Sequence, residues 1–422
     1  MKRILFLLLL VLAVTGWSQT FTFMDNGVAK FAAGEDQFRG PDVLGYIINN
    51  WAARHPGVRV NIVHRDVSRG SLTFDAMLAA GNPPDVWLDA TGYFPAYMND
   101  NYALQLEKYL DLSRYRPDLL ALGTRNGHVY TVPLANIATG MAVNLDMLKQ
   151  IGYTMPPLER WTTTEYLNLA QRLKVAGIPA TIIQGKEGLN GWTDIWLYAH
   201  GAEFFRAGDY SRTTINSPEA VAGLTYIKTI IDRGYTPAPL EHNDDDLVEL
   251  FTTAKVFSGM MQNGHITGWI PQQLAAGKLA KAFDFTFVEF PHVPGRSHTP
   301  VSGYQAAAIA HKSNLESRNQ LVASLLGEVV GMEAQWYWST ITGGFPTLMN
   351  FAPDIGTAAD PAYKAIAGLA ATAGVYKQWP DGPQGQEVRR LWRSLSEQWL
   401  RGRLTSQALL SQFEAEANRI LR

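Results

Sequence analysis

The sequence predicts an α/β fold organised as two lobes. With 422 residues, the chain is longer than a single hydrophobic core usually serves, so we expect two lobes. Segments with strand-like and helix-like hydrophobic periods alternate over residues 20–88, which is typical of a parallel sheet covered by helices. An apolar content of 46% and a charged content of 18% are typical of a folded globular protein.

The first elements follow from changes in hydrophobic period. Period-two alternation predicts strands and a 3.6-residue period predicts helices, in the order strand, helix, strand, helix, strand: 20–24, 42–54, 58–63, 72–80 and 85–88. His55-Pro56-Gly57 ends the first helix, and Gly81-Asn82-Pro83-Pro84 ends the second. Since a helix connects each strand to the next, we expect the three strands to run parallel.

The rest of the chain adds short strands and many helices. Further strands are expected over 130–133, 142–144, 256–261 and 306–310. Further helices are expected over 146–152, 163 onward, 218–231, 249–253, 391–400 and 406–421. Thr162 with Glu165 three residues later predicts a capped helix start, and Ser217 predicts another by the same logic.

Charge and cysteine content exclude several classes of protein. The net charge of −2 is spread along the chain, which argues against nucleic acid as a partner because phosphate binding needs concentrated Lys and Arg. The chain has no cysteine, so disulfides, thiolate nucleophiles, cysteine metal sites and a lipid anchor on an N-terminal cysteine are excluded. We expect no cofactor and no metal.

The N-terminus is typical of an export signal. Lys2 and Arg3 precede an apolar run over 4–14, which is too short to span a bilayer. Gly16 and Ser18 are small residues two positions apart, so we expect cleavage after Ser18 and a signal peptide over 1–18. No later stretch is long and apolar enough to cross a membrane, so the mature protein is expected to be exported and soluble.

A series of short motifs then occurs in a fixed order along the chain. They are HPGVRV (55–60), GNPPDV (81–86), GHVYTVPL (127–134), VNLDML (143–148), GY (152–153), PP (156–157), WT (161–162), NSPEAV (216–221), GY (234–235), FTTAKV (251–256), MMQNG (260–264) and GGFPT (343–347). Their order and spacing resemble the extracellular solute-binding proteins of family 1, the maltose and sugar-binding type. The resemblance covers the chain from about Thr20 to its C-terminus.

The resemblance implies a periplasmic-binding-protein-like fold, in which two α/β lobes joined by a hinge enclose a ligand cleft. By similarity, the chain crosses between lobes near Leu134-Ala135 and again near Gly303-Tyr304. The implied N-terminal lobe contains 19–135 and 305–335, and the implied C-terminal lobe contains 136–304 and 336–422. Such proteins close on a ligand by hinge motion.

The function implied is that of the substrate-binding subunit of an ABC transporter, which is not an enzyme. It would capture a monosaccharide or oligosaccharide and deliver it to permease subunits in the inner membrane, acting as a monomer. A binding protein without a lipid anchor would diffuse away unless an outer membrane retained it. We therefore expect a periplasmic location.

A carbohydrate site needs flat aromatic faces together with several hydrogen-bonding groups, because a sugar has hydroxyls at its rim and weakly apolar faces. In open α/β sheets such groups lie where strands end at their carboxyl ends. Strand-end position and family similarity give the candidate ligand-binding residues Asn26, Asp89, Asn136, Trp192, Asp194, His265, Trp269, Tyr304, Trp338 and Trp379.

Several of these candidates have a structural alternative. Asn and Asp also serve turns. Trp192 is expected in a loop, whereas Trp196 is expected in the core. Trp336 and Trp338 cannot share one helical face, so one of them is expected in the core. His265 is either a ligand donor or a polar group at the end of a strand.

Two alternative functions stay open. The same fold could bind a glycerol phosphodiester, a polyamine or a peptide. Arg39, Arg206 and Arg389 are available for a phosphate, and Asp25, Asp89 and Asp194 are available for a cation. An exported glycosidase would need a pair of carboxylates at a fixed separation. The one dense acidic run, 241–246, is expected to be a solvated loop before a helix that begins near 247.

Overall fold

The computed structural model describes most of the chain, which divides into two compact units. The described residues are 19–25, 43–64, 72–95, 97–156, 160–189, 191–206, 209–295, 301–342, 344–351, 361–373, 375–376, 380 and 382–422. Unit 1 falls within Met1–Thr91, Tyr97–Leu134 and Ala306–Tyr337, and unit 2 within Gly92–Ala96, Ala135–Gln305 and Trp338–Arg422. The signal peptide expected over 1–18 lies outside the described residues.

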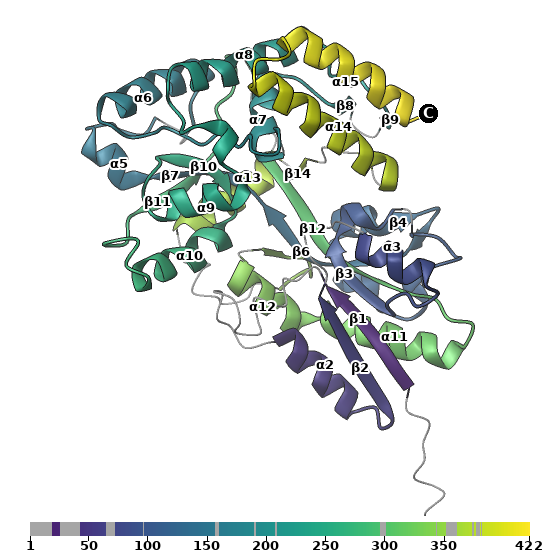
Figure 1. The fold of residues 1–422 in the computed structure, drawn as a ribbon. Coiled ribbons are helices and arrows are strands. Elements are labelled where there is room, and N and C mark those ends of the chain that lie inside the picture. Colours follow the sequence, from purple (N-terminus) through teal and green to yellow (C-terminus); the bar gives the residue numbers. More distant parts are fainter. Residues whose placement is uncertain are drawn as a thin grey trace, which may run out of the picture. The chain divides into compact units, whose positions relative to one another are not determined.

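Unit 1 contains parallel strands with helices on both faces. Its elements are β1 (Gln19–Asp25), α2 (Val43–Ala53), β2 (Val58–His64), α3 (Leu72–Ala79), β3 (Val86–Ala90), α4 (Pro117–Leu120), β4 (Thr124–Arg125), β5 (His128–Val129) and α11 (Glu316–Val329), with short 3-10 helices at Leu106–Lys108, Leu112–Arg114 and Ala121–Gly123. Strand β1 lies between β2 and β3 and is parallel to both (Figure 1). The parallel arrangement predicted for the first three strands is confirmed.

Apart from the short segment Gly92–Ala96, the chain changes unit within three further elements. They are β6 (Thr131–Ala138), β12 (Val301–Ala310) and α12 (Met332–Thr342). In unit 1, residues 306–310 of β12 pair antiparallel with β3. The strand order of the whole sheet is β13-β6-β12-β3-β1-β2, where β13 is Phe345–Pro346, and β14 (Val375–Tyr376) pairs with β12.

Aromatic rings attach the helices of unit 1 to its sheet. The ring of Phe21 in β1 meets the indole of Trp51 in α2 edge-on, at a centroid distance of 6.0 Å. That indole also donates a hydrogen bond of 3.0 Å to Ser324 Oγ in α11, so α2 and α11 cover the same face. Trp87 in β3 stacks on Phe74 of α3 at 4.0 Å. All four rings are fully buried, and such pairs add about 0.5–1.5 kcal/mol each beyond burial of area.

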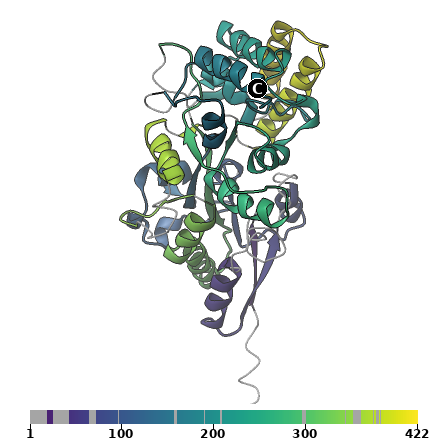
Figure 2. The ribbon, with the colours of Figure 1, turned by 90° about the vertical axis from the view of Figure 1, so that its left-hand side faces the viewer.

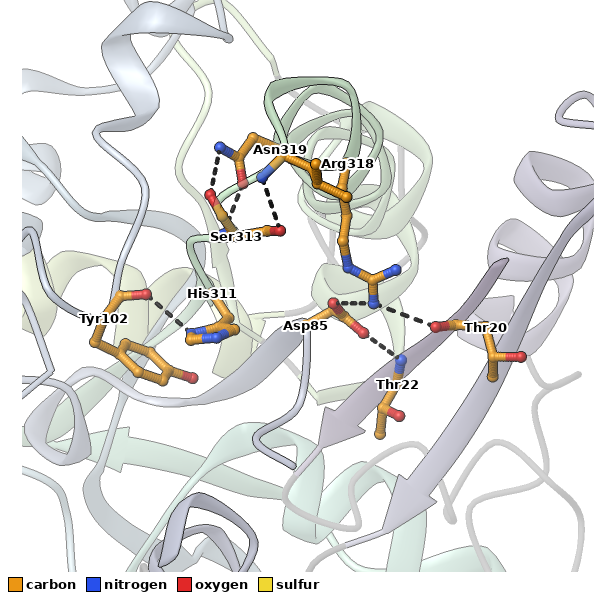
Figure 3. A network of polar contacts seen from close by, with 9 residues as sticks. Thr20, Thr22, Asp85, Tyr102, His311, Ser313, Arg318 and Asn319 are labelled. Atoms are coloured by element: carbon orange, nitrogen blue, oxygen red, sulfur yellow. Dashed lines mark hydrogen bonds and ion pairs between the residues drawn. The ribbon is translucent and has the colours of Figure 1, made fainter. Parts of the chain in front are cut away.

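Asp85 lies at the centre of a polar network that holds the strands of unit 1 in register (Figure 3). Its Oδ2 accepts a 2.8 Å hydrogen bond from the backbone amide of Thr22 in β1, and its Oδ1 pairs with Arg318 Nη2 of α11 at 2.6 Å. The same guanidinium donates to the carbonyl of Thr20 at 3.2 Å. The carbonyl of Asp85 accepts from the amide of His311, just after β12. One residue therefore joins β1 and α11 through its side chain and the end of β12 through its backbone carbonyl.

Unit 2 is built on a small antiparallel sheet between helices. Its strands are β7 (Gly140–Asn144), β8 (Phe205–Arg206), β9 (Asp209–Thr213), β10 (Ser258–Met261), β11 (Phe285–Val288), β13 (Phe345–Pro346) and β14 (Val375–Tyr376). Its helices are α5 (Leu145–Gln150), α6 (Thr163–Val175), α7 (Gly191–Ala199), α8 (Pro218–Asp232), α9 (Asp244–Thr252), α10 (Asn263–Ala275), α13 (Pro361–Ala373), α14 (Gly382–Leu400) and α15 (Ser406–Ile420). Figure 2 shows α14 and α15, in yellow, side by side.

Alternation along β7 separates the two cores of unit 2. The strand order is β10-β7-β11, with antiparallel pairing throughout. Met141 and Val143 belong to the larger core, which α6, α7, α8, α14 and α15 supply. Ala142, between them, belongs to the smaller core of α9, α10 and α13. Successive strand residues point to opposite faces, so helices cover both faces of this sheet.

The two helix starts predicted from capping residues are confirmed, and one predicted loop is wrong. Thr162 and Glu165 form a capping box at the start of α6, and Ser217 caps α8 by accepting from the Ala220 amide. The acidic run at 241–246 is not a loop up to 247: helix α9 begins at Asp244, and Asn243 is its N-cap. Carboxylates in the first turn favour this earlier start because they complement the positive end of the helix dipole.

The helices of unit 2 also begin at other positions than expected. Helix α14 begins at Gly382, nine residues before the expected 391. Helix α10 follows β10 after a single residue, although only the end of a strand was predicted there. Among the described residues, no helix combines the length and apolarity that a membrane crossing requires.

Replacing Asp85 with alanine is expected to lower the free energy of unfolding by about 3 kcal/mol, because it leaves Arg318 and the Thr22 amide without their acceptor. The measurement is urea unfolding followed by tryptophan fluorescence. Asp118→Ala is the matched control: it breaks an exposed pair with Arg116 and should cost less than about 0.5 kcal/mol. Equal effects of the two variants would contradict the role given to Asp85.

Candidate functional site

The carboxyl ends of three parallel strands in unit 1 bring acidic and imidazole side chains to one edge of the sheet. Asp25 ends β1, His64 ends β2, and Asp89 is the second-last residue of β3. This edge is where open α/β sheets bind ligands, because the connecting segments diverge there and leave room for a solute.

Asp25 and His64 form a pair across β1 and β2. They are register partners in the parallel ladder, so their side chains lie on the same face. His64 Nδ1 lies 3.1 Å from each oxygen of the Asp25 carboxylate. The Asp25 side chain is 0% exposed and the His64 side chain is 30% exposed. The buried Asp25 carboxylate is therefore bonded to an imidazole that is partly accessible to solvent.

Asp89 is held by its own strand. Its Oδ2 accepts a 3.1 Å hydrogen bond from the Trp87 indole, and its Oδ1 accepts from the amide of Ala90 at 2.8 Å. The residue is 1% exposed.

The predicted candidate Asn26 lies outside the described residues. His64 was absent from the predicted candidates, and Asp25 was named only as a possible partner of a cation, although the end of a β-branched strand at His64 is a signal that could have found the pair.

In unit 2, Asp194 lies inside the hydrophobic core rather than at a surface. It is in the first turn of α7 and is 0% exposed, with Oδ1 accepting a 2.9 Å hydrogen bond from the Trp392 indole of α14. Its buried Oδ2 has no hydrogen-bond partner among the described residues. Asp194 thus presents no surface to a solute in this structure.

Burial raises the pKa of the Asp194 carboxyl well above its ordinary value. The Trp392 hydrogen bond and the positive charges of Arg393 and Arg389 oppose this effect but are smaller. Gly188, with φ 81°, lets the preceding segment approach α14, where any Cβ would collide with the carbonyl of Arg393. The close packing of α7, α14 and this segment excludes water from the acid.

The indole side chains divide between core and surface. Trp196 is 1% exposed in the larger core of unit 2, as predicted. Trp338 is 2% exposed, whereas Trp336, two residues earlier in α12, is 47% exposed. The expectation that one of the two belongs to the core is confirmed, and the buried one is the predicted ligand residue Trp338. Trp269 is half-buried in α10.

Helices contain two candidates that were expected in a loop or at the end of a strand. Trp192 is the second residue of α7 and not part of a loop, and His265 lies in the first turn of α10 and not at the end of a strand. Asn136 is 8% exposed within β6, where it pairs with Phe345 of β13. Tyr304 is in β12, and its side chain, like all of Trp379, lies outside the described set.

The structure therefore places the described candidates in different surroundings. In unit 1, Asp89 shares the carboxyl edge of the sheet with Asp25 and His64. In unit 2, Asp194 and Trp338 are buried. Within the described ranges, no group of three or more His, Cys, Asp or Glu side chains could hold a metal ion.

Comparison with known proteins gives a family and a fold. The model of a family described as bacterial extracellular solute-binding protein matches residues 47–365. A binding protein of Brucella abortus (strain 2308) is 27% identical over 247 residues, which are 56% of this chain. The match spans 58% of the length of that curated relative, less than two thirds.

Solved structures resemble the whole chain at low identity. Maltose-bound MalE3 of T. maritima has a TM-score of 0.75 at 19% identity, covering 94% of this chain and 98% of that one. A Thermotoga lettingae ABC transporter solute-binding protein with bound α-D-tagatose scores 0.75 at 18% identity, covering 96% and 100%. UgpB of Mycobacterium tuberculosis, in complex with glycerophosphocholine, scores 0.75 at 19%, covering 96% and 98%. The fold is that of the two-lobed periplasmic binding proteins.

Replacing Asp194 with asparagine is expected to remove a pH dependence of stability. A raised pKa means that the folded state holds a proton that the unfolded state has released, so stability falls as pH rises from about 4 through the folded pKa. The slope in that window is up to about 1.4 kcal/mol per pH unit. An amide does not titrate, so urea unfolding of Asp194→Asn over the same pH range should lack this slope.

Asp194→Ala is the control, because it keeps no acceptor for the Trp392 indole and should be destabilised at every pH. If Asp194→Asn shows the same slope as the wild-type protein, the protonated state of this acid is refuted.

Proposed function

The chain belongs to the bacterial extracellular solute-binding proteins, and from that premise we propose that it is the substrate-binding subunit of an ABC importer that captures a carbohydrate. The observation that carries the proposal is the pair of Asp25 and His64 at the carboxyl edge of the parallel strands in unit 1, with Asp89 near the end of the adjacent strand β3. This is the position where an open α/β sheet binds a small solute.

The chemistry of this edge favours a neutral, hydroxyl-rich ligand. A carbohydrate offers many hydroxyl groups, and the partly exposed imidazole of His64 is a polar side chain that a solute at this edge can reach. Asp25 and Asp89 already share their charge with donors of the protein, namely the imidazole, an indole and a backbone amide. A polyamine would need unengaged and accessible carboxylates, whereas Asp25 and Asp89 are both buried.

The similarity to UgpB supports a second candidate ligand, a glycerol phosphodiester. A phosphate group would call for Arg, Lys or the amides of a helix N-terminus. The described residues at the carboxyl edge are two acids and one imidazole, and an acid beside a phosphate is repulsive. The carbohydrate therefore fits the described groups better.

Trp269 is the proposed stacking residue of unit 2. Its half-buried position in α10 leaves part of the indole accessible to the apolar face of a sugar ring. In contrast, Trp196 and Trp338 have no accessible face to offer. Among the indoles of unit 2 with a described side chain, Trp269 is thus the better candidate.

The rest of the transport cycle follows from the family and not from contacts in the structure. The proposed partners are the permease subunits of the importer in the inner membrane, and the proposed location is the periplasm. The hinge expected near Leu134-Ala135 and Gly303-Tyr304 stays a prediction, as do the monomeric state and the lobe bounds.

A thermal-shift screen of the purified protein against sugars, glycerol phosphodiesters and polyamines tests the proposal. A ligand that binds only the folded state stabilises it by about 2.7 kcal/mol at one hundred times its dissociation constant, so the unfolding temperature rises. We expect a carbohydrate to give this rise. A rise only with phosphodiesters or only with polyamines would refute the carbohydrate assignment while leaving the family membership intact.

Replacing Trp269 with alanine is expected to weaken carbohydrate binding about tenfold, and titration calorimetry measures it. Trp269→Phe, which keeps an aromatic face, is the matched control and should lose less. Equal affinity of wild type and Trp269→Ala would remove this indole from the site.

A further inference from the structure

We propose that His64 contacts the bound solute directly and accepts a hydrogen bond from one of its hydroxyl groups through Nε2. This inference rests on the proposed capture of a carbohydrate and names a contact residue that neither the family match nor the sequence motifs supplied. Geometry at the ends of β1 and β2 carries it.

The position of His64 places it where a solute binds. It is the last residue of β2, and its register partner Asp25 is the last residue of β1, so both stand at the carboxyl edge of the sheet. The imidazole is 30% exposed while the carboxylate behind it is 0% exposed. A solute at this edge reaches the ring of His64 and not the oxygens of Asp25.

The Asp25 carboxylate fixes the tautomer of His64. An ionised carboxylate has only acceptor sites, so the nitrogen 3.1 Å from both of its oxygens, Nδ1, must carry a hydrogen. In the neutral ring Nε2 is then an acceptor, and a hydrogen bond made by the other nitrogen sets the orientation of the imidazole. Among the described residues, Nε2 of His64 has no hydrogen-bond partner.

An oriented, solvent-accessible acceptor matches the chemistry of a carbohydrate. Sugar hydroxyls donate as well as accept, and a neutral imidazole nitrogen accepts without the desolvation penalty of a full negative charge. Asp25 thus acts as a positioning residue: it holds the ring, and His64 makes the contact.

A surface pair elsewhere in unit 1 provides a matched comparison. His128 Nδ1 lies 2.7 Å from Glu107 Oε1, with side-chain exposures of 42% and 35%. It has the same histidine–carboxylate chemistry, but it is in the short hairpin of β4 and β5 instead of at the parallel edge. His128→Asn therefore measures the effect on stability and affinity of a histidine-to-asparagine change outside the proposed site.

The test compares His64→Asn with His128→Asn by titration calorimetry against the carbohydrate found in the screen. An asparagine amide can donate to Asp25 as Nδ1 does, but it has no group in place of Nε2. We expect His64→Asn to unfold within about 2 °C of the wild-type protein and to bind about five- to tenfold more weakly, the loss of one hydrogen bond. His128→Asn should bind as tightly as the wild type.

An NMR measurement distinguishes a direct contact between His64 and the ligand from a purely structural role of His64. In ¹⁵N-labelled wild-type protein, the imidazole signals that vanish in His64→Asn should report a hydrogen on Nδ1, and the Nε2 signal should shift when carbohydrate is added. If His64→Asn binds the carbohydrate as tightly as the wild type, or if the Nε2 signal does not shift on carbohydrate addition, the inference is wrong. The proposed function is unaffected by either result. A wild-type protein that binds no carbohydrate overturns both.

Discussion

The architecture of unit 1 depends on the neutralisation of one buried carboxylate. Asp85 is 7% exposed, and its two oxygens accept from a strand amide and from the guanidinium of Arg318. That guanidinium also lies 4.3 Å above the ring of Phe21, so the cation is shared between an acid and an aromatic face. Without such partners a buried charge would cost several kcal/mol.

This constraint reaches the candidate site through the strand register. Asp85 fixes the start of β3 against Thr22 of β1, and Met24 then pairs with Trp87 two positions further along β3. Once the starts of β1 and β3 are fixed, their ends are fixed too, which puts Asp25 and Asp89 at one edge. The polar network lies near the amino ends of the strands, and the candidate site lies at their carboxyl ends.

Four buried aspartates show how environment decides what an acid does. Asp85 has an arginine, Asp25 has an imidazole, and Asp89 has an indole and an amide. Asp194 has a single indole donor on Oδ1, with no hydrogen bond to Oδ2 in the described structure, and burial therefore favours its protonated form. Asp85 therefore joins strands to a helix, Asp25 orients the proposed contact residue, and Asp194 is a neutral group in the core.

The sequence by itself determined what depends on near neighbours. Hydrophobic periods predicted the first strands and helices, and the spacing of Thr162 and Glu165 predicted a helix start, because each involves residues within a turn or two. The ordered motifs predicted the family. Only the tertiary structure decided which polar and aromatic groups are buried: Asp194 meets Trp392 across 198 positions, and Asp85 meets Arg318 across 233. Exposure and charge pairing depend on contacts between residues far apart in the sequence, and local sequence spacing does not predict such contacts.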